Sequence, residues 1–184
     1  VLTWTIERRL FHSPHMESHK SKANIAATLT WKDVEWLKSF SRIPMLLKGI
    51  LNPDDAEHAV RLGASGIIVS NHGARNLDTV PATAEALPRI TEIVAGRVPV
   101  LVDGGIRRGT DVLKAIALGA AAILIGRPYI YGLGAAGSAG VSQVINMLRH
   151  ELELAMALAG LPSLNSIDRS ALWPLSRFPE VPAK

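Results

Sequence analysis

An internal repeat constrains this chain more than any other feature of its sequence. A glycine turn, a helix-like stretch, a Leu-Gly-Ala motif and an apolar stretch occur twice, at positions 56 residues apart (49 and 105, for example). The matched positions are Gly49-Ile50, Asp55, Ala59, Leu62-Gly63-Ala64 and Ile67, which recur as Gly105-Ile106, Asp111, Ala115, Leu118-Gly119-Ala120 and Ile123. Two tandem copies predict four strand–helix units, and such alternation builds parallel sheets with right-handed crossovers.

Apolar periodicity and turn residues predict where the individual elements lie. We expect strands at residues 44–48, 66–69, 98–102 and 122–125. We expect helices at residues 31–40, 53–61, 82–95, 110–118 and 142–159. Thr30 and Asp33 have the spacing of a capping box for the first helix, and Pro88 should bend or restart the third. Residues 1–29 and the tail after Gly160 show no period.

Four strand–helix units are half of an eight-stranded (β/α)8 TIM barrel, which takes roughly 250 residues when complete. With 184 residues the chain is too short to close such a barrel alone. An open doubly wound sheet is the alternative α/β fold, but its phosphate fingerprint belongs in the first strand–helix turn, where none is found. We therefore expect residues 30–184 to supply half of a barrel and residues 1–29 to form a loop.

Composition narrows the class of protein and of partner. No apolar stretch reaches the roughly 18 residues that cross a bilayer, and no signal pattern opens the sequence, so we expect a cytoplasmic protein with no membrane partner. The net charge of +4 comes from scattered lysines and arginines, and only 5% of residues are aromatic, which disfavours nucleic-acid binding. The histidines at 12, 15 and 19 lack supporting ligands, so a solvated loop is favoured over a metal site.

The run Ser70-Asn71-His72-Gly73-Ala74-Arg75 begins where the buried strand 66–69 ends. Parallel strands place their chemistry at their carboxyl ends. A histidine there can accept a proton near neutral pH, and the guanidinium of Arg75 can bind a carboxylate through two hydrogen bonds. The pattern predicts a site for a small acid with a removable proton. The alternative is that His72 caps the strand and Arg75 is a surface charge.

Two glycine-containing turns follow the last two strands, where barrels usually bind phosphate. The first is Asp103-Gly104-Gly105-Ile106-Arg107, ahead of a helix, and the second is Gly126-Arg127-Pro128. Glycines let backbone N–H groups approach a phosphate, a helix N-terminus adds partial positive charge, and arginine binds the oxygens directly. The alternative is two ordinary turns with surface arginines.

Lys48, the run 70–75, the loop 103–111 and Gly126-Arg127 occur in this order, and together they closely resemble the FMN-dependent α-hydroxy acid oxidases and dehydrogenases. That family includes lactate oxidase, glycolate oxidase and mandelate dehydrogenase. The likeness runs from about residue 31 to residue 173 and corresponds to the last four strand–helix units of the family's barrel. Residues 1–29 fall where the family has its variable lid.

The resemblance implies FMN as cofactor and oxidation of an L-2-hydroxy acid to the 2-keto acid, with oxygen, giving hydrogen peroxide, or another electron acceptor. It implies that His72 is the base that removes the hydroxyl proton as the α-hydrogen leaves toward flavin N5. Arg75 would bind the substrate carboxylate, Lys48 would lie near flavin N1 and C2=O, and Ser70 would contact the isoalloxazine edge. The remaining cofactor-binding residues would be Asp103, Gly104, Gly105, Ile106, Arg107, Gly126 and Arg127.

The contacts that the family's amino-terminal half makes with flavin and substrate have no counterpart here. We therefore expect the remaining half of the barrel to come from the same or another chain, and we also expect a homo-oligomer. One alternative is another FMN or phosphate barrel enzyme, such as an isomerase or nucleotide dehydrogenase. The other is a half-barrel that binds phosphate ligands without catalysis.

Overall fold

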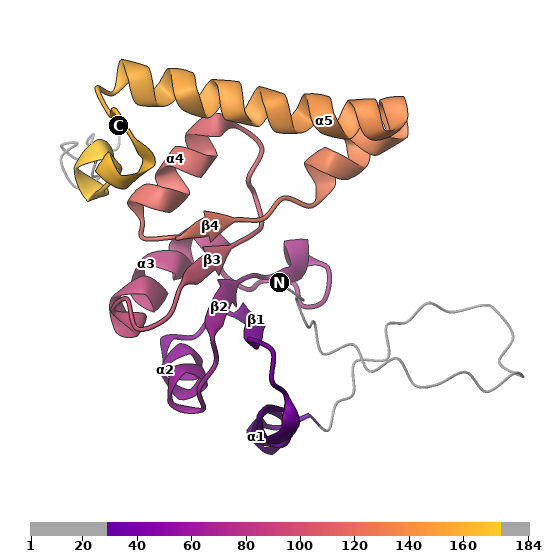
Figure 1. Ribbon diagram of the computed structural model, residues 1–184, viewed down its shortest axis with the longest axis vertical. Helices are drawn as coiled ribbons and strands as arrows, with labels where there is room; N and C mark the ends of the chain where they lie inside the picture. The colour runs from indigo at the N-terminus through magenta and orange to yellow at the C-terminus, as the bar shows by residue number, and fades with distance from the viewer. Residues whose placement is uncertain (1–28, 174–184) are drawn as a thin grey trace, which may run out of the picture.

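The computed structural model describes residues 29–173, which form one layer of helices packed on a small parallel sheet (Figure 1). The strands are β1 (Leu46–Ile50), β2 (Gly66–Val69), β3 (Val100–Val102) and β4 (Ala122–Ile123). The α-helices are α1 (Trp31–Phe40), α2 (Pro53–Arg61), α3 (Thr83–Val94), α4 (Gly109–Ala117) and α5 (Arg127–Leu158). Short 3₁₀ turns lie at His72–Ala74, Leu164–Ser166 and Arg169–Ala171.

Each strand of the sheet pairs in parallel with the next strand along the chain, in the order β1-β2-β3-β4. Leu46 is opposite Gly66, Ile67 opposite Val100, and Leu101 opposite Ala122. A doubly wound sheet reverses its strand order at a switch point, and this sheet does not. The predicted half-barrel order is therefore present. Figure 1 shows α2 and α3 on the same side of the strands.

The main core lies between the sheet and this helix layer. Ile67 and Val69 of β2 point into it, while Ile68 and Ser70 alternate to the opposite face of the sheet. All four residues of β2 are buried, as its uninterrupted apolar sequence predicts for a strand covered on both sides. The helices contribute small and branched side chains to the core, namely Ala56, Ala59, Leu87, Ile90 and Val94.

The Leu-Gly-Ala motif of the internal repeat ends two equivalent helices. Leu62, Gly63 and Ala64 donate backbone hydrogen bonds to carbonyls of the last turn of α2, at His58, Val60 and Ala59. The second copy makes the same bonds one repeat later, on α4. Both motif glycines are left-handed, with φ of +79° at Gly63 and +100° at Gly119, so glycine is favoured at this position. The predicted tandem arrangement is therefore confirmed.

Several predicted element boundaries shift in the structure. Helix α1 has the predicted bounds and the predicted capping box, in which the Thr30 backbone N–H donates to Asp33 Oδ2 over 2.7 Å. Helix α3 continues through Pro88 as one helix, so it does not restart there. The strand predicted at 44–48 lies at Leu46–Ile50, and its pairing with β2 shifts register between Lys48 and Ile50, where Gly49 has a φ of +99°. The strands predicted at 98–102 and 122–125 are shorter, at Val100–Val102 and Ala122–Ile123.

The last helix differs most from its prediction. The sequence predicts it at residues 142–159, but α5 begins at Arg127 and bends sharply at Ala136 and Gly137. The two arms touch where Gly132 meets Gly140, since a Cβ on Gly140 would lie 1.9 Å from the Gly132 carbonyl oxygen. Figure 1 shows the helix folding back on itself at this end. A stretch of glycine and alanine carries no apolar period, which is why the first arm was missed.

Helix α5 is fixed to the start of α4 by Glu151. Its Oε2 accepts hydrogen bonds from the Gly109 backbone N–H at 2.8 Å and from Arg108 Nε at 3.0 Å. The Gly109 N–H and the Arg108 guanidinium lower the pKa of the Glu151 carboxyl below its ordinary value of 4.5. Glycine is required at 109, because a Cβ there would lie 2.1 Å from the backbone nitrogen of Leu152.

Two sequence expectations concern features that the structure describes only in part. No helix within residues 29–173 combines the length and the apolar content needed to span a bilayer. Within the same residues, no group of three or more His, Cys, Asp or Glu side chains could hold a metal ion. The predicted loop at residues 1–29 and the end of the tail, residues 174–184, lie outside the described part apart from residue 29.

We predict that Glu151→Gln destabilises the fold in a pH-dependent way. A carboxyl with a lowered folded-state pKa contributes stability above its unfolded value, about 4.5, and loses it as the pH falls through the folded value. The melting temperatures of wild type and variant, followed by circular dichroism, should differ most near neutral pH, and the difference should shrink once the pH falls below the unfolded-state pKa and vanish below the folded-state pKa. Glu153→Gln, which removes an exposed pair with Arg149, is the matched control and should change little. A constant difference at all pH values would contradict the assignment.

Candidate functional site

A cleft of about 330 Å³ opens at the carboxyl ends of the four strands. Lys48 reaches it from β1, His72 and Arg75 from the loop after β2, and Arg127 from the start of α5. The sequence-predicted residues that line it are Lys48, His72, Arg75, Asp103, Gly104, Gly105, Ile106, Arg107, Gly126 and Arg127. Ser70 lines an adjoining hollow, and Lys48 and His72 line it as well. The structure therefore gathers residues separated by up to about eighty positions in the chain.

The ammonium group of Lys48 connects three neighbouring strand ends. Its Nζ lies 2.8 Å from Asp103 Oδ2, after β3, and donates to Ser70 Oγ, after β2, over 2.6 Å. The Lys48 and Asp103 side chains are only 18% and 17% exposed. A half-buried ion pair with a short additional hydrogen bond holds the charge at a fixed position. The cation is thus presented at the floor of the cleft rather than free in solvent.

One carboxylate oxygen of Asp103 has no hydrogen-bond donor among the described residues. Oδ2 is paired with Lys48, whereas Oδ1 is buried and accepts no hydrogen bond from any described residue. Buried polar atoms are normally hydrogen-bonded, so an unpaired carboxylate oxygen in a cleft indicates a missing donor. A hydroxyl group of a bound molecule would satisfy it.

The turn that carries His72 has an unusual backbone. His72, Gly73 and Ala74 are left-handed in succession, with φ of +54°, +65° and +59°. Two of these residues have side chains, for which this conformation is strained. Ser70 Oγ accepts from the His72 N–H at 3.1 Å, and Asn71 Oδ1 accepts from the Gly73 N–H at 3.0 Å. These two hydrogen bonds hold a turn that places the half-buried imidazole on the same cleft as Arg75.

The glycines of the 103–107 loop have two different surroundings. A Cβ on Gly104 would lie 3.1 Å from Thr83 Oγ1 and 3.3 Å from Asn71 Oδ1, so this glycine allows close packing. A Cβ on Gly105 would meet nothing within 4 Å, so its backbone is open to an approaching ligand. Among the described residues, the backbone N–H groups of Gly105 and Ile106 have no acceptor. They are available to bind an anion.

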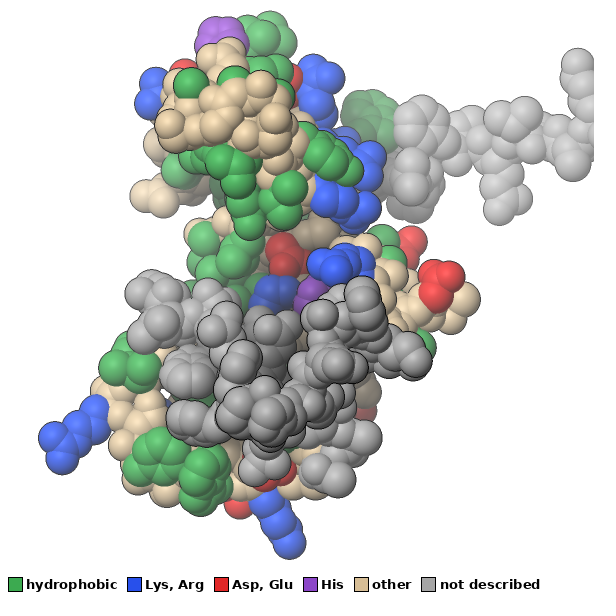
Figure 2. Space-filling model, turned by 90° about the vertical axis from the view of Figure 1, so that its right-hand side faces the viewer, with side chains coloured by type: hydrophobic (Ala, Val, Ile, Leu, Met, Phe, Trp, Pro, Cys, Tyr) green, Lys and Arg blue, Asp and Glu red, His purple; other side chains and the backbone are tan. Residues whose placement is uncertain are grey.

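Arg107, Gly126 and Arg127 line one end of the cleft, here called the anion-binding corner. Helix N-termini add to its positive character. Asp111 Oδ2 accepts from the backbone N–H groups of Arg107 and Arg108, each at 2.9 Å, which fixes the loop to the start of α4. Helix α5 begins at Arg127, beside the same cleft. Helix N-termini favour anions, and arginine adds bidentate hydrogen bonds. In Figure 2, basic, acidic and histidine side chains gather in the middle of this face, below α5.

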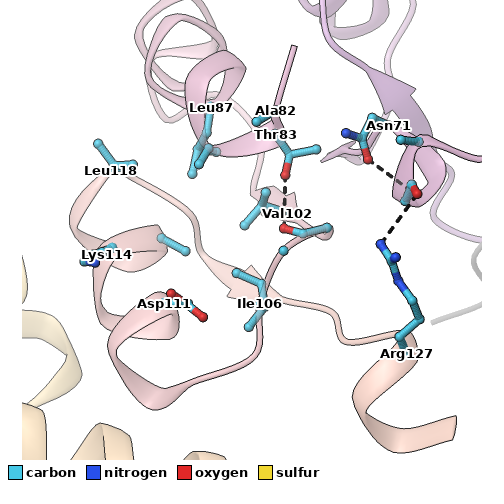
Figure 3. A pocket seen from close by; sticks show the side chains of 16 residues that line it. Asn71, Ala82, Thr83, Leu87, Val102, Ile106, Asp111, Lys114, Leu118 and Arg127 are labelled. Atoms are coloured by element: carbon cyan, nitrogen blue, oxygen red, sulfur yellow. Dashed lines mark hydrogen bonds between the residues drawn. The ribbon is translucent and has the colours of Figure 1, made fainter. Parts of the chain in front are cut away.

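A second pocket lies behind the Gly104-Gly105 turn, between α3 and α4 (Figure 3). It measures about 280 Å³ and is mostly apolar, and Leu87 and Leu118 are among the residues that line it. Figure 3 also shows Arg127 reaching the loop after β2, where its Nη2 lies 3.5 Å from the Gly73 carbonyl oxygen. The loops after β2 and β4 are therefore in contact.

Sequence reasoning did not assign a role to three side chains that support the site. Thr83 Oγ1 donates to the Gly104 carbonyl at 3.2 Å, Asn71 closes the left-handed turn, and Asn76 contacts the His72 ring. Only Asn71 carried a recognisable signal, because asparagine after a strand commonly hydrogen-bonds the backbone two residues on. The other two contacts depend on where the chain folds back.

Comparison with known proteins decides the family. Residues 4–174 match the model of the FMN-dependent dehydrogenase family. The chain belongs to this family. The match begins well before residue 31, where the resemblance based on motifs begins. It confirms the predicted cofactor and fold, since FMN is the cofactor of this family and the chain is part of its TIM barrel.

The chain is also similar to curated oxidases. It is 55% identical over 154 residues to 2-hydroxyacid oxidase of Dictyostelium discoideum and 56% identical over 149 residues to glycolate oxidase 1 of Oryza sativa subsp. indica. These alignments cover 84% and 81% of this chain but 40% of each relative. The chain thus spans about two fifths of the length of the curated relatives that it matches.

Solved structures give the same result. The chain superposes on mandelate oxidase with a monooxide FMN adduct at a TM-score of 0.74 and 50% identity, covering 77% of this chain and 45% of that one. The chain also superposes on a mandelate oxidase variant with (S)-mandelic acid at a TM-score of 0.74, and the match covers 77% of this chain and 42% of that one. The four-stranded sheet is therefore the corresponding part of a TIM barrel, as the strand order indicates.

We predict that Ser70→Ala lowers the free energy of unfolding by about 1–3 kcal/mol, the cost of leaving buried donors without an acceptor. The Ser70 hydroxyl is 2% exposed and accepts from both Lys48 Nζ and the His72 N–H. Urea denaturation measures the change. Ser39→Ala, on the exposed side of α1, is the control and should stay within about 0.5 kcal/mol of wild type. Equal effects of the two substitutions would exclude the anchoring role.

Proposed function

We propose that this chain is the carboxyl-terminal half of an FMN-dependent oxidase that converts an L-2-hydroxy acid to the 2-keto acid. The observation that carries the proposal is that a proton acceptor, His72, a guanidinium, Arg75, and a fixed cation, Lys48, line one cleft at the carboxyl ends of parallel strands. Relatives named 2-hydroxyacid oxidase, glycolate oxidase and mandelate oxidase support the substrate class.

The residues of the cleft fit FMN. Asp103 Oδ1, which lacks a donor, would accept a hydrogen bond from a ribityl hydroxyl, and the free N–H groups of Gly105 and Ile106 would donate to the phosphate. Arg107 and Arg127 would bind the phosphate oxygens from the two sides of the corner. Ser70 and Lys48 would face the isoalloxazine ring. Gly126, where a Cβ would meet nothing within 4 Å, would allow close approach of the cofactor, and Gly104 would hold the loop in place by packing against Thr83.

The substrate would be held and deprotonated by the loop after β2. Arg75 would bind the carboxylate through its planar fork, which orients the 2-hydroxyl group toward His72. His72 would accept the hydroxyl proton as the alcohol is oxidised. When bound, FMN supplies the acceptor for the α-hydrogen and its electron pair. Both protein groups act from one short loop, so the strained turn sets their relative position.

Lys48 would provide electrostatic stabilisation. Its ammonium group is held by Asp103 and Ser70 within a site that is largely shielded from solvent. A preorganised cation favours negative charge that develops near it during the reaction, because no reorganisation is needed at that moment. The ion pair with Asp103 would thus serve to fix the position of Lys48 as well as to bind the cofactor.

The complete enzyme needs more than this chain describes. The remaining half of the barrel, from the same or another chain, would pair with the outer edges of β1 and β4. Oxygen, giving hydrogen peroxide, or another acceptor would take the electrons. The homo-oligomeric state and the cytoplasmic location stay predictions; the relative in Arabidopsis thaliana that is 57% identical is named a peroxisomal (S)-2-hydroxyacid oxidase.

A second candidate function is FMN or phosphate binding without turnover. It is favoured by the fact that the anion-binding corner, with both helix N-termini and both arginines, lies wholly within this chain. The alternative of another FMN barrel reaction, an isomerase or nucleotide dehydrogenase, has no comparable support, since the similar proteins named above are hydroxy acid oxidases.

We predict that His72→Ala, made in the chain joined to its missing barrel half, abolishes flavin reduction while FMN stays bound. Loss of a general base costs about 10²- to 10⁴-fold in rate. Anaerobic stopped-flow spectroscopy with lactate, glycolate and mandelate measures the reduction, and the visible spectrum reports bound FMN. Unchanged reduction in the variant would refute the role of His72. A wild-type protein that binds FMN and is reduced by no hydroxy acid would favour the binding-only alternative.

We predict that Arg75→Lys weakens substrate binding, because an ammonium group lacks the planar fork. KM should rise about ten-fold or more, with a smaller change in kcat, in steady-state assays of the same joined protein. Arg89→Lys, on the exposed side of α3, is the matched control. If both variants keep the wild-type KM, Arg75 does not bind the carboxylate.

A further inference from the structure

The peptide group between Gly104 and Gly105 has a single hydrogen bond within residues 29–173. Thr83 Oγ1 donates to the Gly104 carbonyl oxygen at 3.2 Å, whereas the Gly105 N–H has no acceptor among these residues. Figure 3 marks the bond with a dashed line at Thr83. Thr83 is the first residue of α3 and is only 3% exposed, so its hydroxyl group is shielded from water. The proposed reaction assigns this hydroxyl group no role.

This peptide group needs an anchor because both of its neighbours are glycine. The φ values are +87° at Gly104 and +76° at Gly105. Rotation of a peptide plane changes ψ of the residue before it and φ of the residue after it. Glycine tolerates many such combinations, since it has no Cβ. The hydrogen bond from Thr83 therefore selects one orientation from several that the chain could adopt.

The selected orientation determines where the Gly105 N–H points. In a trans peptide the C=O and N–H bonds lie in one plane and point in opposite directions. The Gly104 carbonyl points to Thr83, which lines the apolar pocket behind the turn and is not one of the described residues that line the cleft. Gly105 does line the cleft, so its N–H points away from Thr83 and toward the anion-binding corner. We propose that Thr83 is a positioning residue that fixes this peptide group with the Gly105 N–H presented to the phosphate of FMN.

This inference rests on the proposed binding of FMN by the 103–107 loop, and a comparison of FMN with riboflavin tests it without turnover. The two ligands differ only in the phosphate group, so the ratio of their dissociation constants measures what the phosphate contributes. Quenching of flavin fluorescence gives both constants in the chain joined to its missing barrel half. Thr83→Val keeps the shape and removes the hydroxyl group. It should weaken FMN binding about five-fold, as expected for one neutral hydrogen bond, and leave riboflavin binding unchanged.

Two further variants separate positioning from stability. Thr83→Ser keeps the donor and should keep the wild-type ratio of the two constants. Thr91→Val is the matched control, because Thr91 is also on α3 and its hydroxyl group bonds backbone carbonyl oxygens, at Pro88 and Leu118, outside the cleft. It should leave the ratio unchanged, whatever its effect on the melting temperature. An equal loss of FMN and riboflavin affinity in Thr83→Val, or no rescue by Thr83→Ser, would overturn the proposal.

The amide signal of Gly105 reports the orientation of the peptide group directly. The full chain is labelled with ¹⁵N-glycine and titrated with inorganic phosphate, and the signal is assigned with Gly105→Ala. In the wild type the Gly105 amide proton should shift downfield, because it donates to the anion. In Thr83→Val the shift at saturation should be smaller. A wild-type Gly105 signal that does not respond to phosphate, or an equal shift in both proteins, would also contradict the proposal.

Turnover of the joined protein separates this inference from the proposed function. If Thr83→Val narrows the preference for FMN over riboflavin but no hydroxy acid reduces the bound flavin of the wild type, the proposed oxidase fails and the positioning role stands. If hydroxy acids reduce the flavin and Thr83→Val keeps the wild-type preference, only the role of Thr83 fails.

Discussion

The ammonium group of Lys48 is the point at which the sheet and the site depend on each other. It can reach both Ser70 Oγ and Asp103 Oδ2 only because β1, β2 and β3 are parallel neighbours whose carboxyl ends lie at one edge. Without that pairing, a lysine and an aspartate 55 positions apart would meet only by chance. With it, a charge stays fixed and partly desolvated in the cleft, where electrostatic effects are stronger than in water.

The site is built by hydrogen bonds that support an otherwise unfavourable backbone. Three successive left-handed residues would not persist in an isolated peptide, because two of them carry a Cβ. The Ser70 hydroxyl and the Asn71 amide hold this turn by accepting its N–H groups. Strained backbone of this kind is typical of functional sites, where the surrounding structure determines the conformation. The same hydroxyl contacts Lys48, so the cation and the histidine share one support.

The second support of the site is remote in sequence. Helix α5 packs on α4 through Gly109, and Glu151 accepts the hydrogen bond from the first N–H of α4. Because the anion-binding loop leads directly into α4, this contact also fixes the loop that carries Arg107. A single long helix with a glycine-lined bend thereby contributes Arg127 at one end and the anchor of the neighbouring loop at the other.

The sequence by itself determined the repeated strand–helix order and the buried central strand, because both depend on local apolar periodicity. It also determined the helix ends at Leu-Gly-Ala, which need glycine at a left-handed position, and the family, which depends on contiguous motifs. The tertiary structure alone decided the remaining features. The bend of α5 at Gly137 was not predictable, because the glycine- and alanine-rich stretch around it has no apolar period. The close contact of Gly132 with Gly140 is seen only in the folded chain. The shared position of Lys48 between Ser70 and Asp103, and the unpaired Oδ1 beside it, follow from strand pairing, which brings distant residues together without a trace in local sequence.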